Sequence, residues 1–262
     1  MNWLELWRRP DLSLQAWQVF KRNLLVFKKI WVTNITFNFL EPLMYLGAMG
    51  YGLGMYVTDI QGMPYLNFIA PGLIASSAMW AAASECSYDS FVRMKFQHTY
   101  HAIIATPINI EEVVLGDILF GVFKSVLYGS VILLVIAVLG LVPSFYALLI
   151  PLVLVLCGFV FAELGLIWVG FVPNIDSLSY FFTLLVTPMF LFAGVFYPLE
   201  GMPLFIQRLA WFTPLYHLVV LIRSLSFGQV SWNLLFNVLW LVIFILIFLF
   251  PPLNLMRQRL IK

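Results

Sequence analysis

The stretch YALLIPLVLVLCGFVFAELGLIWVGF, residues 146–171, decides the class of this protein. Glu163 is the one charged residue within it. A helix needs about 20 mostly apolar residues to cross a hydrocarbon core that is roughly 30 Å thick. Residues 146–171 satisfy that requirement, so they predict a membrane-spanning helix.

Five further stretches of the chain fit the same requirement. They lie near residues 31–56, 66–88, 113–140, 178–197 and 232–252. Another apolar stretch, 203–227, is broken by Pro203, Pro214 and Gly228 into pieces too short to cross, which predicts a segment that enters the membrane and returns. The sequence therefore predicts an all-α polytopic membrane protein with six transmembrane helices and one re-entrant segment.

The composition of the chain agrees with this class. Of its 262 residues, 63% are hydrophobic and 10% are charged, whereas a soluble domain has about 45–50% apolar and roughly 25% charged residues. A soluble enzyme or a disordered chain is therefore excluded, and the net charge of +2 is too small to indicate a nucleic-acid partner. The spans contain no group of residues with metal-ligand spacing, so neither a metal site nor a catalytic site is predicted.

The distribution of lysine and arginine predicts the orientation in the membrane, because these residues are in excess in cytoplasmic segments. Most of the 14 cations fall in three segments that six spans would place on one side. These cations are Arg8, Arg9, Lys21, Arg22, Lys28, Lys29, Arg93, Lys95, Arg257, Arg259 and Lys262. We expect residues 1–29 to form a cytosolic amphipathic interface helix, 30–252 the transmembrane domain, and 253–262 a cytosolic tail.

The expected interface helix has one apolar face. Trp17, Phe20, Leu24 and Phe27 recur at spacings of three and four residues. Such a helix lies along the inner leaflet, with its basic side chains at the lipid headgroups. Two interpretations remain open: a plain membrane anchor, and a helix that also contacts a cytoplasmic partner.

The stretch from Ser87 to Ile108, between the second and third spans, is long and combines charges, histidines and aromatic rings. It ends at Thr106-Pro107, where proline would stop one helix and allow the next to begin. One interpretation is an amphipathic helix over about 90–106 that docks a partner protein. The other is a solvated linker with a short surface helix.

Seven residues of the predicted spans are candidates for a substrate path. An intramembrane charge costs about 2.5–3.5 kcal/mol unless it faces protein or water, and aromatic rings offer flat contact surfaces. The candidates are Glu41, Tyr45, Lys124, Glu163, Phe190, Phe196 and Tyr197. The alternatives are a structural ion pair for Lys124, and an interfacial belt, an exit site or a closing plug for the aromatic residues.

Motifs along the chain resemble the permeases of type-2 ABC exporters, and in particular the nodulation-factor (lipo-chitooligosaccharide) exporter permeases. The matching segments keep their order and fit the six predicted spans. They are Glu41-Pro-Leu-Met-Tyr-Leu-Gly, Gly50-Tyr-Gly-Leu-Gly54, Pro71-Gly72, Ala105-Thr-Pro-Ile-Asn, Leu115-Gly-Asp-Ile-Leu, Phe192-Ala-Gly-Val-Phe-Tyr-Pro-Leu199 and Trp211-Phe-Thr-Pro-Leu-Tyr-His217.

The resemblance implies a bacterial inner-membrane protein with cytoplasmic termini that acts as a homodimer with two separate ATPase subunits. The interface helix and a coupling helix between the second and third spans would contact those subunits. The coupling residues would be Arg93, Lys95, Phe96, Tyr100, His101, Ile103 and Pro107. Residues of about 198–227 would form re-entrant extracytoplasmic helices.

The resemblance implies export of an amphipathic substrate, such as a lipid-linked oligosaccharide or glycolipid. The chain has no G-x-x-x-x-G-K-[ST] loop, so ATP and Mg²⁺ would be bound by the partner and no cofactor by this chain. Alternative functions are an exporter of hydrophobic drugs or other lipids, a proton-driven secondary transporter, and a membrane-embedded lipid-modifying enzyme.

Overall fold

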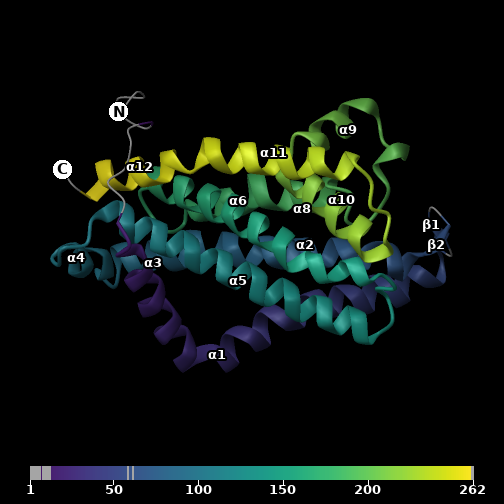
Figure 1. Ribbon diagram of the computed structural model, residues 1–262, viewed down its shortest axis with the longest axis horizontal. Helices are drawn as coiled ribbons and strands as arrows, with labels where there is room; N and C mark the ends of the chain where they lie inside the picture. The colour runs from purple at the N-terminus through teal and green to yellow at the C-terminus, as the bar shows by residue number, and fades with distance from the viewer. Residues whose placement is uncertain (1–6, 8–12, 58, 61, 261–262) are drawn as a thin grey trace.

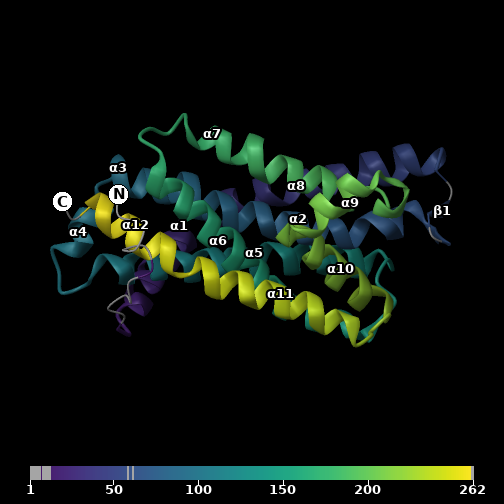
Figure 2. The same ribbon diagram turned by 90° about the horizontal axis from the view of Figure 1, so that it is seen from above.

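The computed structural model describes residues 7, 13–57, 59–60 and 62–260, and its helices lie lengthwise beside one another (Figures 1 and 2). A two-residue hairpin pairs β1 (Asp59–Ile60) with β2 (Met63–Pro64). The helices are α1 (Ala16–Gly47), α2 (Tyr65–Ser84), α3 (Ser90–Lys95), α4 (Thr99–Ile104), α5 (Ile110–Val138), α6 (Ile150–Phe171), α7 (Leu178–Phe181), α8 (Thr187–Phe192), α9 (Leu204–Trp211), α10 (Pro214–Phe227), α11 (Asn233–Phe248) and α12 (Phe250–Leu260).

Four continuous helical stretches of the described chain are long and apolar enough to cross a membrane. They are Tyr65–Lys95, Ile110–Val138, Phe145–Phe171 and Asn233–Leu260. They coincide with the second, third, fourth and sixth predicted spans. The protein is therefore a helical membrane protein, and a fifth crossing is added if α9 and α10, which are bent by 86°, are taken as one broken span.

The first and fifth predicted spans differ from these four, so the six-span arrangement stays a prediction. The first lies within α1 and the short π-helical and 3₁₀ turns that follow it, and the polar residues Asn34 and Glu41 dilute its apolar character. The fifth is a shorter apolar segment, Leu178–Phe192, made of α7, a π-helical turn and α8.

The predicted interface helix is the first half of α1 rather than a separate element. The backbone is non-helical at Ile30 (φ −124°, ψ 18°), and Figure 1 shows the sharp bend in α1. Its apolar stripe packs on protein, because Phe20 and Phe27 are buried against Phe120 of α5. Phe20 and Phe27 therefore face α5, and the location of this helix along the inner leaflet stays a prediction.

The predicted cytosolic tail is also an element of the helical bundle. Residues 253–260 belong to α12, which contacts α5 and α6, and Leu253 and Met256 are fully buried. The segment after Pro252 continues the helical direction of α11 instead of leaving the bundle. Of the cations used to predict orientation, Arg8, Arg9 and Lys262 lie outside the described residues.

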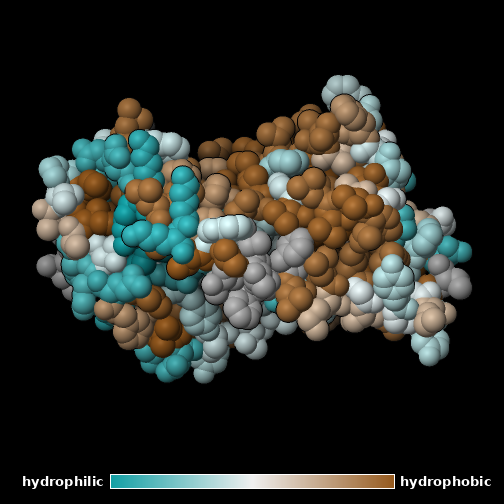
Figure 3. Space-filling model, turned by 90° about the horizontal axis from the view of Figure 1, so that it is seen from below, coloured by the Kyte–Doolittle hydropathy of each residue, from teal (hydrophilic) through white to brown (hydrophobic). Residues whose placement is uncertain are grey.

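The two ends of the molecule carry different elements. We call the end with α3, α4, the start of α5 and α12 the α4 end, and the end with α9 and α10 the α9 end (Figures 1 and 2). The face in Figure 3 has hydrophilic side chains gathered over the α4 end and a broad hydrophobic region beyond it. This distribution is the one expected if the long axis crosses a membrane.

Candidate coupling site and substrate path

A buried carboxylate, Asp117 on α5, connects three other helices at the α4 end. It accepts hydrogen bonds from Asn23 Nδ2 of α1 at 2.7 Å, from Ser90 Oγ and Arg93 Nη2 of α3 at 3.0 Å each, and from the Tyr100 hydroxyl of α4. The Asp117 side chain is 1% exposed. Because hydrogen bonds to an ionised group are stronger than neutral ones, Asp117 fixes α1, α3 and α4 relative to α5.

A second buried carboxylate, Glu85, lies in the π-helical turn Glu85–Asp89 between α2 and α3. It accepts a hydrogen bond from Arg93 Nη1 at 2.5 Å and is paired with Lys124 Nζ of α5. Lys124 also lies 3.4 Å from Asp89. Of the two interpretations of Lys124, the structure thus contains the ion pair with a carboxylate, and that carboxylate belongs to Glu85 rather than Glu41.

The predicted coupling helix over 90–106 is divided into two elements. Residues 90–95 continue the long helical stretch that begins at Tyr65, and the chain then breaks at His98, which has a left-handed backbone (φ 52°). Only the six residues of α4 form a separate helix. A left-handed residue with a side chain is unfavourable inside a right-handed helix, which explains the break.

The seven predicted coupling residues fall into two groups. Lys95, Phe96, His101 and Pro107 are exposed, and Ile103 is half-buried. Arg93 and Tyr100 instead face the interior and bind Asp117. Burial is the main cause that raises the pKa of the Tyr100 hydroxyl, and the neighbouring Asp117 charge adds to it. These two side chains are hence unavailable as a docking surface.

Two carboxylates in the first turn of α5 bind residues that lie near the two ends of the described chain. Glu112 accepts hydrogen bonds from the backbone N–H groups of Asn109 at 2.8 Å and Ser13 at 3.0 Å. Glu111 pairs with Arg257 of α12 at 2.9 Å. Carboxylates are favourable at the positive N-terminal end of a helix, so the start of α5 is a stable anchor for α1 and α12.

Sequence reasoning missed Asp117, Asn23 and Glu112 as functional candidates. The available signal was an acidic residue in a long apolar helix, which generally marks a specific polar partner. Asp117 meets that condition, because it lies in the apolar stretch 113–140. Its partners lie 17 to 94 residues away in the chain, and no sequence spacing relates them.

A cavity of about 320 Å³ opens between α1, α2 and α8, and its lining contains three predicted path residues. Glu41, Tyr45 and Phe190 line it together with Trp80, Ser76 and Ser77. Phe196 lies beside it, with its ring centroid 4.9 Å from that of Phe190 and 6.2 Å from that of Tyr45. Edge-to-face and tilted ring pairs at such distances are favourable, so three of the predicted aromatic residues form one cluster.

The aromatic lining continues from this cavity toward the α4 end. Trp80 stacks on Phe182 with centroids 5.3 Å apart, and Phe182 stacks on Tyr88 at 5.4 Å. Tyr88 lies in the same π-helical turn as Glu85. We call the six rings of Tyr88, Phe182, Trp80, Tyr45, Phe190 and Phe196 the aromatic track.

The remaining predicted path residues lie elsewhere. Lys124 lines a smaller cavity of about 190 Å³ at the α4 end with Arg22, Glu85 and Arg93. Glu163 on α6 is fully buried, and its carboxylate oxygens have no hydrogen-bond partner among the described residues. Tyr197 donates a hydrogen bond to the Leu191 carbonyl at 2.7 Å and lines a different cavity at the α9 end.

Comparison with known proteins identifies the family of this chain. The family model of the ABC-2 type transporter matches residues 14–227. Nodulation protein J of Rhizobium leguminosarum bv. viciae is 34% identical over 263 residues, which cover 100% of this chain and 96% of that protein. Nodulation protein J of Rhizobium meliloti (strain 1021) is 35% identical over 231 residues, with coverages of 87% and 82%.

A relative of lower sequence identity is named as a transport permease. The inner membrane transport permease YadH of Escherichia coli (strain K12) is 28% identical over 204 residues, with coverages of 77% and 78%. The family match over residues 14–227 includes the helices that carry the Asp117 network and the aromatic track. The resemblance inferred from the motifs is confirmed, and the chain belongs to the ABC-2 type transporter family, as a membrane permease subunit.

Proposed function

We propose that this chain is the permease of an ATP-driven exporter that moves a lipid-linked oligosaccharide or a similar glycolipid out of the bacterial inner membrane. Two copies would form the translocation unit with two separate ATPase subunits, which bind ATP and Mg²⁺. The α4 end would face the cytoplasm, and so would both termini. The similarity to nodulation proteins J supports the substrate class.

The aromatic track is the observation that carries this proposal. Three of its rings, those of Tyr45, Trp80 and Phe190, line the cavity between α1, α2 and α8. Two further rings stack in succession from Trp80 toward the α4 end. Aromatic faces interact with the apolar C–H faces of sugar rings as well as with acyl chains, and Glu41, Ser76 and Ser77 add acceptors and hydroxyls to the same cavity. An amphipathic glycolipid matches this mixed lining better than a purely apolar substrate does.

Truncation of the track is expected to slow transport. Tyr45→Ala and Phe190→Ala should each lower ATP-dependent glycolipid transport about two- to tenfold, because an aromatic contact contributes roughly 0.5–1.5 kcal/mol. Transport is measured in proteoliposomes that contain the permease and its ATPase. Tyr45→Phe keeps the ring and should retain transport, and Tyr51→Ala, on an exposed tyrosine outside the track, is the matched control. Equal transport by all four variants contradicts the proposed path.

The exposed residues of the predicted coupling site give a separate prediction. Phe96→Ala and His101→Ala should weaken ATPase binding or uncouple ATP hydrolysis from transport about tenfold, because a central interface residue contributes more than about 1 kcal/mol. Phe96 is 62% exposed, so its truncation leaves the permease fold intact. Phe145→Ala, on an exposed ring remote from α4, is the control. Full coupled transport by Phe96→Ala and His101→Ala rejects this docking surface.

The same proteoliposomes separate the other functions. Transport that needs a proton gradient but no ATPase indicates a secondary transporter, and chemical change of the lipid without either indicates an enzyme. Transport of hydrophobic drugs in preference to glycolipids indicates a drug exporter. The proposed function requires transport that depends on both the ATPase and hydrolysable ATP.

A further inference from the structure

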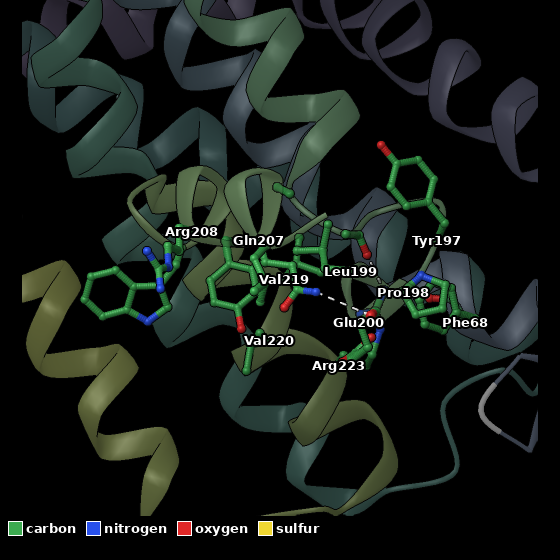
Figure 4. A pocket seen from close by; sticks show the side chains of 15 residues that line it. Phe68, Tyr197, Pro198, Leu199, Glu200, Gln207, Arg208, Val219, Val220 and Arg223 are labelled. Atoms are coloured by element: carbon green, nitrogen blue, oxygen red, sulfur yellow. Dashed lines mark hydrogen bonds between the residues drawn. The ribbon is translucent and has the colours of Figure 1, made fainter. Parts of the chain in front are cut away.

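The cavity at the α9 end, which Tyr197 lines, has a volume of about 340 Å³ and is separate from the aromatic track (Figure 4). Its walls are the chain segment 193–200, α9, α10 and Phe68 of α2. The 86° bend between α9 and α10 creates the space, because two straight helices would pack side by side.

A buried cation, Arg223 of α10, lies in the cavity wall. Its guanidinium is centred 3.9 Å above the Phe68 ring, and its Nη2 donates hydrogen bonds to the carbonyls of Gly194 at 2.8 Å and Phe68 at 3.2 Å. Its Nε is buried and has no hydrogen-bond partner among the described residues. Both bonded acceptors are neutral carbonyls, and the Glu200 carboxylate in the same lining offsets part of the Arg223 charge. The buried Nε–H is the donor of Arg223 that is left for a ligand.

The rest of the lining combines flat rings with planar polar groups. Trp211, Tyr216 and Tyr197 supply the rings, and Gln207, Arg208 and Glu200 supply donors and acceptors. Gln207 is held by its Nε2 donating to the Met202 carbonyl at 2.8 Å and to the Glu200 carbonyl at 3.3 Å, the second drawn in Figure 4. Two arginines and one glutamate give this lining a net positive charge, which favours ligands rich in acceptor oxygens.

The surface beside the cavity is strongly apolar. Leu204, Phe205, Leu209 and Phe212 of the α9 region are 53–74% exposed, while Gln207 and Trp211 contribute to the cavity lining. An exposed apolar face of this kind suits a helix that lies at a membrane interface. A lipid whose tail contacts this face would present its headgroup at the mouth of the cavity.

We propose that the cavity between α9, α10 and Phe68 is a binding site for the saccharide headgroup of the exported lipid, occupied as the lipid leaves the permease. Trp211 and Tyr216 hold a sugar ring face, and Arg223 and Arg208 donate hydrogen bonds to acceptor oxygens such as acetamido carbonyls. Both Nε2 hydrogens of Gln207 already bind carbonyls of the chain, so its Oε1 accepts a hydrogen bond from a sugar hydroxyl. That this saccharide is the headgroup of the transported lipid rests on the proposed function. That the cavity binds a saccharide does not depend on the proposed function.

Binding of chitotetraose to the purified permease in lipid nanodiscs tests the site without ATPase or transport. Chitotetraose offers acetamido carbonyls, and its fully N-deacetylated form replaces them with ammonium groups, which Arg223 should repel. We expect saturable binding of chitotetraose by calorimetry and at least about tenfold weaker binding of the deacetylated form. Binding of neither sugar, or equal binding of both, overturns the proposal.

Variants locate the binding within the chain. Trp211→Ala should weaken chitotetraose binding about tenfold, and Trp232→Ala, which truncates a 90% exposed tryptophan outside the cavity lining, should leave it unchanged. Trp211, Arg223 and Gln207 also contact neighbouring protein groups, so Arg208→Ala, on an exposed residue of α9, provides the variant that keeps the fold. Unchanged affinity in Trp211→Ala, Arg208→Ala and Gln207→Ala places the saccharide elsewhere and overturns the proposal.

The outcomes distinguish this site from the proposed function. If the permease transports glycolipid with its ATPase but the cavity variants bind chitotetraose normally, the site is wrong and the function stands. If the variants lose chitotetraose binding but the wild-type complex transports no glycolipid, the saccharide site stands and the proposed function fails.

Discussion

Replacement of Asp117 by alanine is expected to destabilise the permease by about 3–5 kcal/mol, the range for removal of one partner from a buried ion pair. The substitution leaves the Arg93 guanidinium without one of its two carboxylates and removes the acceptor of Asn23 and Tyr100. Unfolding by SDS in mixed micelles, followed by tryptophan fluorescence, measures the change. The docking of α4 should be lost first, because Tyr100 is its buried link to Asp117.

Two further variants make this prediction specific. Asp117→Asn keeps the side-chain shape and loses the charge, so it should be destabilised less than Asp117→Ala. Asp176→Ala removes an exposed aspartate in the loop after α6 and should have no measurable effect on unfolding. A stability of Asp117→Ala equal to that of Asp176→Ala would mean that the Asp117 network does not hold α1, α3 and α4.

Replacement of Gly158 on α6 is expected to separate α5 from α6. A Cβ atom at this position would lie 2.5 Å from Val122 Cα and 3.1 Å from Ser125 Cβ. The nearest atom is a backbone atom, so rotation of a side chain cannot relieve this contact. Gly158→Ala should therefore cost about 1–3 kcal/mol through overpacking, and Gly158→Leu should abolish folded protein in detergent extracts. The same SDS titration and a gel-filtration profile measure both effects.

Gly47→Ala is the matched control for this packing argument. A Cβ atom at Gly47 of α1 meets no atom within 4 Å, and alanine is favoured over glycine in a helix by roughly 0.5–1 kcal/mol. Gly47→Ala should thus raise the free energy of unfolding, whereas Gly158→Ala should lower it. If Gly158→Ala were neutral or stabilising, α5 and α6 would not approach as closely as the structure indicates.

The sequence alone predicted the membrane class and four of the long apolar helices, because burial in lipid requires a local property, about 20 apolar residues in succession. The bend between α9 and α10 was likewise expected from Pro203, Pro214 and Gly228. The residue types of Tyr45, Phe190 and Phe196 predict that these rings belong to a substrate path, and the fold places them in one cluster.

Tertiary structure decided which polar side chains meet. The sequence of the apolar stripe of α1 is compatible with contact to lipid or to protein. In the fold, Phe20 and Phe27 of this stripe pack on Phe120 of α5. The inward orientation of Arg93 and Tyr100, the pairing of Lys124 with Glu85, and the docking of α12 all depend on carboxylates on other helices. Local hydropathy determines which segments enter the membrane, whereas partners for buried charges are set by contacts between segments distant in the chain.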